Sequence, residues 1–338
     1  MTGVNPQRPV ADETRDVAPR PAGTAGRGRL LKIVLSTLIL AFLIHSINFA
    51  RAAEVLGAVD PWLAGLAALV LAAVPAVSIP RWRAILACLG HALPTYVIGR
   101  GLYIGAFFNQ VLPSSIGGDA WRIWFCTRAG VPLGVAANSV LIERLVGLLA
   151  VLLSFCLTLP VLLHRVGDDP VRWLLWLMFA SCFAVVLGLA FIAVAARKFE
   201  RLRLLRPLAA LGHALSSVAR SRDVPLLLWT GVLGQLVAIL AFFLVGRSVG
   251  APLSFGDCAV TLAPGLLVAL APVSLGGWGV REGAFMVLLG FYDISPEQSL
   301  VVSVLFGLAL LAAALPGLVL WLYQRAPGPK GNDTLQAR

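Results

Sequence analysis

The amino-acid sequence predicts an all-α fold, a polytopic integral membrane protein with six to eight transmembrane helices. Of its 338 residues, 59% are hydrophobic and only 13% are charged, and the mean hydropathy is +0.89. This balance lies far outside that of water-soluble globular domains. Several apolar stretches also reach about 20 residues, the length that an α-helix needs to cross a bilayer.

Six apolar stretches are long enough to cross a membrane, and two are shorter. The long stretches lie at 31–50, 62–79, 133–163, 172–196, 226–249 and 299–322. We interpret the first as a retained anchor, because its basic leading tail and long apolar run exceed those of a cleaved signal peptide. The shorter stretches, 101–116 and 258–275, each follow a turn rich in Gly and Pro, at 90–94 and 250–252.

The predicted organisation is one membrane domain between two tails. Residues 1–29 mix Pro, Gly, Arg and Asp with few apolar residues, which predicts a disordered basic tail in the cytoplasm. Residues 30–325 form the membrane domain, with repeat halves at about 62–163 and 226–322 and a basic cytoplasmic loop at 197–225. Residues 326–338 form a second cytoplasmic tail.

The net charge of +11 is better explained by membrane orientation than by nucleic acid, because the basic residues lie in short loops between spans. A cytoplasmic N-terminus places the basic tail and the loop at 197–225 inside, as the positive-inside rule expects. The other inner loops would then carry Arg81, Arg83, Arg100 and Arg128. We predict a multi-pass protein of a bacterial-type cytoplasmic (inner) membrane, with no nucleic-acid partner.

The sequence contains no template for soluble catalysis. The five cysteines lie in or beside apolar stretches at spacings that fit neither a zinc site nor a redox motif. The four histidines are scattered, and no nucleotide-binding loop or nucleophile motif accompanies them. We therefore predict no cofactor, no metal site and no catalytic residue, and the chain is expected to act as a transporter rather than an enzyme.

The two short apolar stretches end in the same pattern, PxSxGGxxxR, repeated 159 residues apart. Pro removes a backbone donor and a Gly pair permits turns or close backbone approach, so each helix should break there. Paired broken segments predict two re-entrant hairpins in inverted halves, the arrangement of transporter binding sites. The alternative is ordinary spans with Gly/Pro kinks and snorkelling arginines, which gives eight crossings.

Charged residues beside these breaks need partners. Asp119 and Arg122 are three residues apart, so a helix starting at the break would place them on one face. Glu143 and Arg144 interrupt a long apolar run, and a helix beginning at Pro132 would place Glu143 about 15 Å from its start. A later start would place the pair at the interface instead.

Adjacent residues on a helix point about 100° apart, so Glu143 and Arg144 cannot satisfy each other. One economical arrangement pairs Glu143 with an arginine of a broken segment. Arg144, Arg122 or Arg281 then remains for an anionic headgroup, and the alternative is a closed structural ion network. The candidate substrate-binding residues are Asn109, Pro113, Ser115, Gly117, Gly118, Asp119, Arg122, Glu143, Arg144, Pro272, Ser274, Gly276, Gly277, Arg281 and Glu282.

The ordered set of motifs over residues 30–325 resembles the flippase-like family defined by the transmembrane region of lysylphosphatidylglycerol synthases. The resemblance rests on Asn109, Leu112, Pro113, Gly117, Gly118, Asp119, Arg122, Glu143, Arg144 and Gly147, and on PVSLGGWGVRE at 272–282. It implies movement of lipids between leaflets, with phospholipids, hopanoids or lipid-linked sugars as partners. The synthases carry a soluble aminoacyl-transfer domain after this region, whereas here 13 residues follow Arg325, so lipid aminoacylation is not expected.

The leading hypothesis is a lipid translocase that moves a polar or anionic headgroup between leaflets, passively or coupled to an ion gradient. Asp119, Glu143 and Glu282 are the carboxylates that could then carry protons. A membrane-embedded lipid-modifying enzyme is the second hypothesis, because clustered Asp, Glu and Arg also suit acid–base chemistry. The third is an accessory subunit of a lipid or glycolipid synthase, with a separately encoded lipid-modifying enzyme as its partner.

Overall fold

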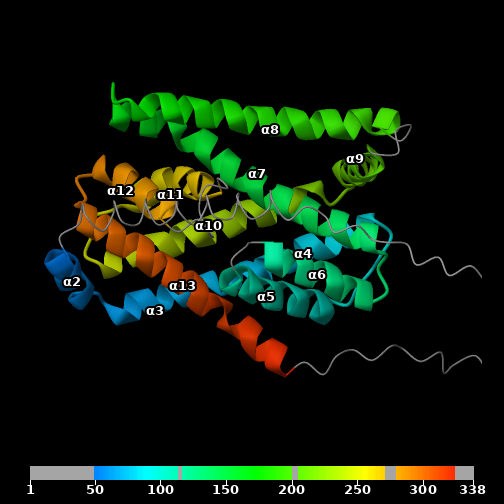
Figure 1. Ribbon diagram of the computed structural model, residues 1–338, viewed down its shortest axis with the longest axis horizontal. Coiled ribbons are helices and arrows are strands. Elements are labelled where there is room, and N and C mark those ends of the chain that lie inside the picture. Colours follow the sequence, from blue (N-terminus) through cyan, green and yellow to red (C-terminus); the bar gives the residue numbers. More distant parts are fainter. Residues whose placement is uncertain (1–48, 113–115, 200–204, 271–278, 324–338) are drawn as a thin grey trace, which may run out of the picture.

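The computed structural model describes residues 49–112, 116–199, 205–270 and 279–323, and within these ranges every regular element is a helix. The helices are α2 (Phe49–Gly57), α3 (Pro61–Leu71), α4 (Ala73–Cys88), α5 (Thr95–Val111), α6 (Ile116–Arg128), α7 (Leu133–Val166), α8 (Val171–Phe199), α9 (Arg206–Ala219), α10 (Val224–Ser248), α11 (Phe255–Ala269), α12 (Val280–Gly290) and α13 (Pro296–Leu322). Figure 1 shows their arrangement. The predicted all-helical class is confirmed.

Five segments of the described chain are long and apolar enough to cross a membrane. They are Pro61–Cys88, Leu133–Val166, Val171–Ala195, Val224–Ser248 and Pro296–Leu322. Each contains or closely matches a stretch that the sequence predicted as a span. The other predicted span, 31–50, lies outside the described residues except for its last two positions, as do the two predicted tails.

The first of these spans is longer than predicted. It begins at a cap in which the Asp60 carboxylate accepts hydrogen bonds from the backbone N–H groups of Trp62 (2.8 Å) and Leu63 (3.3 Å), satisfying donors that a helix start leaves open. After the junction at Ala72 the chain continues as α4 to Cys88.

The prediction that placed Arg81, Arg83 and Arg100 in loops was therefore wrong. Arg81 and Arg83 lie within α4, and Arg100 lies in the second turn of α5. A hydropathy window ends at the first charges, whereas a helix continues through them when the charged groups find partners or reach solvent.

Both short apolar segments are interrupted, and each returns on itself as a helical hairpin. The first arm α5 packs against α6, and the corresponding arm α11 packs against α12. These four helices have 17, 13, 15 and 11 residues, fewer than the roughly 20 needed for a full crossing. Packing of the two arms against each other rules out a single kinked helix at either place.

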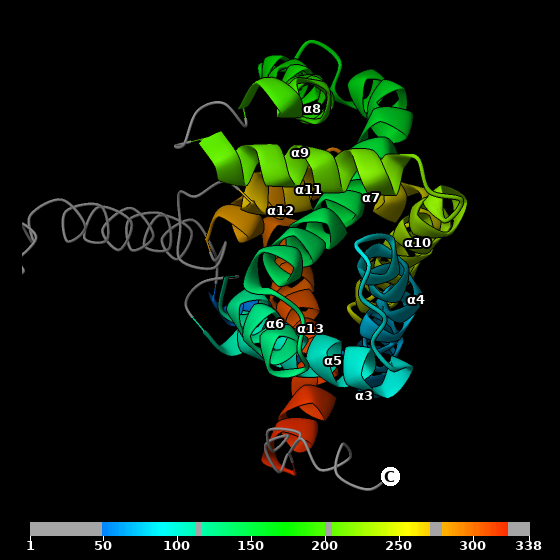
Figure 2. The same cartoon turned by 90° about the vertical axis from the view of Figure 1, so that its right-hand side faces the viewer.

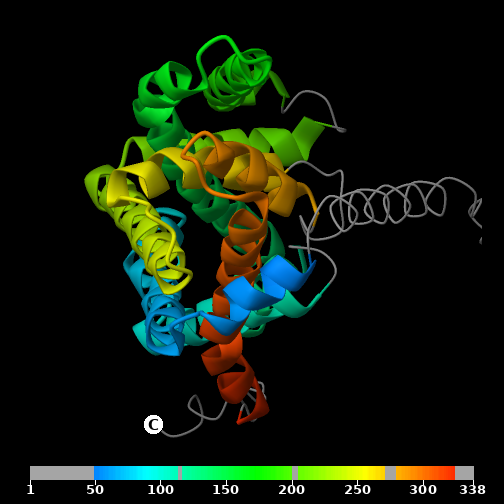
Figure 3. The same ribbon diagram turned by 90° about the vertical axis from the view of Figure 1, so that its left-hand side faces the viewer.

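The same order of contacts recurs in both halves of the chain. The hairpin α5–α6 is followed by the long helix α7, and the hairpin α11–α12 is followed by the long helix α13. Each first arm also packs on the long helix of the other half, α5 on α13 and α11 on α7. Helix α10, the first span of the second half, packs against α3 and α4, which form the first span of the first half. This contact joins the two halves. Figure 3 shows the second half in yellow to orange-red.

Helix α8 forms one edge of the molecule, where it contacts α7 and α9 (Figures 1 and 2). Much of its apolar surface is exposed, which in a bilayer places it against lipid. Helix α9 lies within the predicted basic loop at 197–225 and buries its small apolar face, Ala209, Gly212, Ala214 and Val218. That segment therefore contains an amphipathic helix that hydropathy alone did not predict.

Candidate functional site

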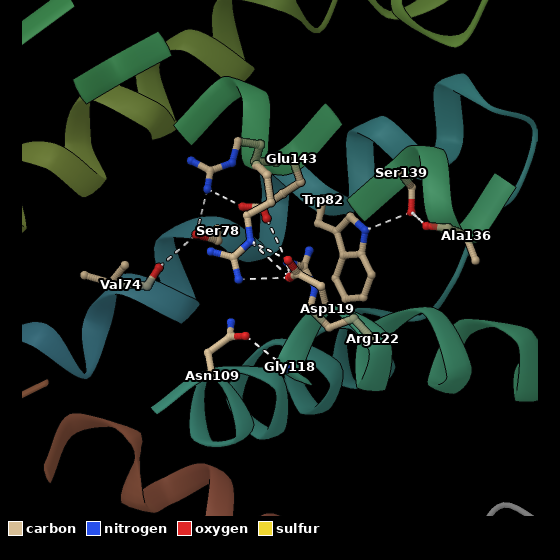
Figure 4. Close-up of polar contacts among 12 residues, drawn as sticks. Val74, Ser78, Trp82, Asn109, Gly118, Asp119, Arg122, Ala136, Ser139 and Glu143 are labelled. Atoms are coloured by element: carbon tan, nitrogen blue, oxygen red, sulfur yellow. Dashed lines mark hydrogen bonds and ion pairs between the residues drawn. The ribbon is translucent and has the colours of Figure 1, made fainter. Parts of the chain in front are cut away.

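Glu143 of α7 lies at the centre of a buried ion network. Its Oε2 atom is 2.8 Å from Nη1 of Arg122 on α6, and its Oε1 atom accepts a hydrogen bond from Nη2 of Arg81 on α4. The three side chains are only 4–8% exposed. Helix α7 begins at Leu133 with Pro132 as its N-cap, as one of the two alternatives expected. Glu143 thus joins one arm of the first hairpin to two membrane spans (Figure 4).

The neighbours of Arg81 on α4 hold both arginines in place. Arg81 Nη2 also donates to Ser78 Oγ at 3.0 Å, and Ser78 Oγ donates to the Val74 carbonyl at 3.1 Å. The guanidinium carbon of Arg122 lies 4.1 Å from the ring centroid of Trp82, a cation–π contact. A cation–π contact with Trp82 therefore stabilises the network in addition to its ion pairs.

Trp82 is itself fixed from α7, the helix that carries Glu143. Its Nε1 donates to Ser139 Oγ at 3.2 Å, and Ser139 Oγ donates to the Ala136 carbonyl at 2.8 Å. Figure 4 shows this chain beside the ion pairs. Because Trp82 and Ser139 are fully buried, the ring has little freedom to move away from Arg122.

A second ion pair lies beside the network and is more accessible. Arg144 Nε is 3.0 Å from each oxygen of Asp119, and Arg144 Nη2 is 2.9 Å from Asp119 Oδ1. The Arg144 side chain is 45% exposed and that of Asp119 is 22% exposed. Asp119 also lies 3.8 Å from Arg122, so the expected pair within α6 exists but is the weaker of its two contacts.

The charges of these five residues do not cancel. Three arginines, 81, 122 and 144, face two carboxylates, 119 and 143, which leaves one excess positive charge. In the described part of the chain, Arg81 Nε and the Nε and Nη2 atoms of Arg122 are buried without a hydrogen-bond partner. Buried donors on a cation are costly unless an acceptor meets them, so the site is suited chemically to an anion.

The glycine pair of the first hairpin brings its two arms into backbone contact. The Gly118 N–H donates to Asn109 Oδ1 at 3.0 Å. A Cβ atom at Gly118 would overlap the Gly105 carbonyl oxygen, and one at Gly117 would overlap the Leu112 side chain. The glycines therefore permit the close approach that places Arg122 beside α5.

The second hairpin carries its own buried carboxylate. Glu282 is 2% exposed, and its Oε2 accepts the Gly279 N–H at 2.6 Å, which caps the start of α12. Its Oε1 lies 2.7 Å from Arg281 Nη2 and 3.4 Å from Ser303 Oγ on α13. A Cβ atom at Gly307 would lie 2.5 Å from Arg281 Nη2, so glycine at this position makes room for the guanidinium.

The structure thus gathers seven predicted site residues around the first hairpin and two at the second. The first group is Asn109, Gly117, Gly118, Asp119, Arg122, Glu143 and Arg144, and the second is Arg281 and Glu282. The predictions for Pro113, Ser115, Pro272, Ser274, Gly276 and Gly277 fall outside the described residues. Sequence reasoning missed Ser78, Arg81, Trp82 and Ser139. The i, i+3, i+4 spacing of the first three was the available signal.

Comparison with known proteins agrees with the motif resemblance. A family model described as the lysylphosphatidylglycerol synthase TM region matches residues 29–317. The match covers all five described spans except the last few residues of α13, and it includes both hairpins. None of the curated proteins matches the chain.

Proposed function

Because the chain belongs to the family of the lysylphosphatidylglycerol synthase TM region, we propose that it is a lipid translocase that moves an anionic headgroup between leaflets. The family relationship indicates a function related to membrane lipids. The finer proposal, translocation, is supported by the chemistry of the first hairpin. It treats both hairpins as re-entrant segments that enter the membrane from opposite sides.

The observation that carries the proposal is that Arg122 is buried with two of its donor nitrogens unpaired. Its side chain is 4% exposed and is held by Glu143 on one side and by the Trp82 ring on the other. Two of its nitrogens, Nε and Nη2, still lack an acceptor. A phosphate oxygen fits such donors well, because arginine binds phosphate through paired, charge-assisted hydrogen bonds.

The physical task of a translocase is to replace the water that a headgroup loses in the bilayer. A polar group buried without hydrogen bonds costs several kcal/mol, and an ionised group costs more. Fixed arginine donors inside the protein lower this cost, while the hydrocarbon chains remain in lipid. The excess positive charge at the first hairpin compensates for the negative charge of a phosphodiester.

Arg144 and Asp119 form the entrance in this mechanism. The Arg144 guanidinium is nearly half exposed and binds Asp119 in a fork. A phosphate can replace the Asp119 carboxylate on Arg144 and then reach Arg122, since Asp119 lies 3.8 Å from Arg122. The Arg281–Glu282 cluster of the second hairpin serves the same headgroup from the other leaflet.

The test is reconstitution of the purified protein into phosphatidylcholine vesicles that contain fluorescently labelled phosphatidylglycerol. We expect protein-dependent exchange of the label between leaflets, and loss of most of that exchange in Arg81→Gln and Arg122→Gln. Arg83→Gln is the matched control, because Arg83 is two residues from Arg81 on α4 but is exposed and contacts Thr95.

Two results would overturn this proposal. One is a rate of exchange that is equal in the wild type and in both buried-arginine variants, including no exchange in any of them. The other is a change in the mass of the labelled lipid, because translocation leaves the molecule intact whereas a lipid-modifying enzyme yields a new species. An accessory subunit would show no exchange of its own, yet would still co-purify with its synthase.

A further inference from the structure

An apolar groove lies between α13, α5 and the junction of α3 and α4. It has a volume of about 630 Å³ and is lined by Ala72, Tyr103, Leu315, Pro316, Val319 and Leu320. This volume lies within the roughly 300–1,000 Å³ typical of small-molecule sites. Leu315 and Val319 are 48% and 52% exposed, so the groove is open along one side.

The single polar group in the lining is already satisfied. The Tyr103 hydroxyl donates to the Ala72 carbonyl at 3.0 Å, at the junction where α3 ends and α4 begins. Tyr103 therefore presents its ring rather than its hydroxyl to the groove. Since every other lining side chain is apolar, the groove offers nothing to a headgroup and suits hydrocarbon.

The floor of the groove is a close contact between the backbones of two helices. A Cβ atom at Gly317 would overlap the Tyr103 carbonyl oxygen, so the backbones of α13 and α5 touch there. Pro316 precedes this contact inside α13, where it removes a backbone hydrogen bond. The two helices are in direct contact at this point, and the side chains on either side form the walls.

A row of aromatic rings joins α13, one of the helices that line the groove, to the first hairpin. Trp321, next to the lining residue Leu320, has its ring centroid 5.6 Å from Phe108 on α5, and Phe108 is 5.2 Å from Trp121 on α6. Trp121 directly precedes Arg122 in the chain, and its Nε1 is buried without a described partner. Aromatic rings thus pack from α13, which lines the groove, through α5 to α6, the helix that carries Arg122.

We propose that this groove binds one hydrocarbon chain of the lipid whose headgroup is bound at Arg122, an inference that rests on the proposed function. The distance fits a single molecule, because Ala72 and Arg81 are nine residues apart on one span, about 13 Å along a helix axis. The hydrocarbon chain lies against α5, α13 and the junction of α3 and α4, so residues of both halves of the protein contact it.

The experiment uses phosphatidylglycerol with a photoactivatable diazirine in its acyl chain, incorporated with the full-length protein into phosphatidylcholine vesicles. After irradiation, peptide mass spectrometry locates the attached lipid. We expect labelling at the groove residues of α13 and at Tyr103. Val319→Trp and Ala72→Phe, which fill the groove, should each lower this labelling several-fold.

Leu308→Trp is the matched control, because Leu308 is 49% exposed on the same helix but does not line the groove. In this variant, labelling of the groove residues should equal that of the wild type. Labelling spread evenly over exposed apolar residues, or unchanged in Val319→Trp, would overturn the inference. Leaflet exchange is measured separately. Groove labelling without exchange would contradict only the proposed function, and exchange without groove labelling would contradict only the chain site.

Discussion

Arg122 Nη1 lies 2.8 Å from Glu143 Oε2, and this ion pair joins the first hairpin to the long helix that follows it. Both side chains are almost fully buried, at 4% and 7% exposure. Arg81 binds the other oxygen of the same carboxylate, so a single glutamate holds two cations. The consequences of this arrangement can be measured as stability and in assays of the proposed lipid exchange.

Glu143→Gln should destabilise the protein strongly. The substitution leaves Arg81 and Arg122 buried without their common anion, and breaking a buried pair in this way costs about 3–5 kcal/mol. Thermal unfolding in detergent should show a clear fall in the midpoint. Glu297→Gln serves as a control, since Glu297 is only partly buried in the first turn of α13, and a midpoint for Glu143→Gln equal to that control would contradict the network.

Arg144→Lys should separate transport from stability. Lysine keeps the charge but loses the forked contact that Arg144 makes with Asp119. Because the arginine is 45% exposed, the stability change should stay within about 1 kcal/mol. Leaflet exchange should fall several-fold in the same vesicles, and undiminished exchange would show that the fork is only structural.

Gly118→Ala should separate the arms of the first hairpin. Its new methyl group would overlap the Gly105 carbonyl oxygen and crowd the Asn109 amide, and relief of such overpacking typically costs about 1–3 kcal/mol. Gly134→Ala on α7 is the control, because nothing lies within 4 Å of a Cβ atom there. Unfolding midpoints should fall for the first variant only, and equal midpoints would contradict the close backbone contact.

Cysteine labelling tests the predicted orientation. Ser221→Cys, in the turn between α9 and α10, should react with a membrane-impermeant maleimide only from the cytoplasmic side. Asp168→Cys, in the turn between α7 and α8, should react only from the opposite side. The long span α8 lies between this turn and the segment that contains Ser221. Labelling of Ser221→Cys from outside intact cells would reverse the proposed topology.

The fold was largely predictable because its determinants are local. The length of an apolar run fixes whether a helix can cross lipid, and the Pro and Gly pattern at 113–118 and 272–277 marked where helices stop. The partner of Glu143 was predictable in kind, as an arginine of a broken segment, because a buried carboxylate requires a cation. The family assignment followed from the same ordered motifs.

Arg81 shows where local reasoning failed. It follows an apolar run in the sequence, so it resembled a charge at the membrane interface, yet it is buried against Glu143, which lies 62 positions later. The spacing of Ser78, Arg81 and Trp82 fits one face of a helix, but it does not identify the distant carboxylate that Arg81 meets. The aromatic row and the groove on α13 were hidden for the same reason, since their residues come from separate spans.

The sequence by itself determined that this protein belongs in a lipid bilayer, which segments can cross it and where two helices break. The length of an apolar run and the positions of Pro and Gly act within one segment, so these features need no knowledge of the tertiary structure. Only the tertiary structure decided which charges meet. Ion pairing depends on distances of a few ångströms between side chains from different helices, and those distances exist only once the hairpins have packed onto the long helices.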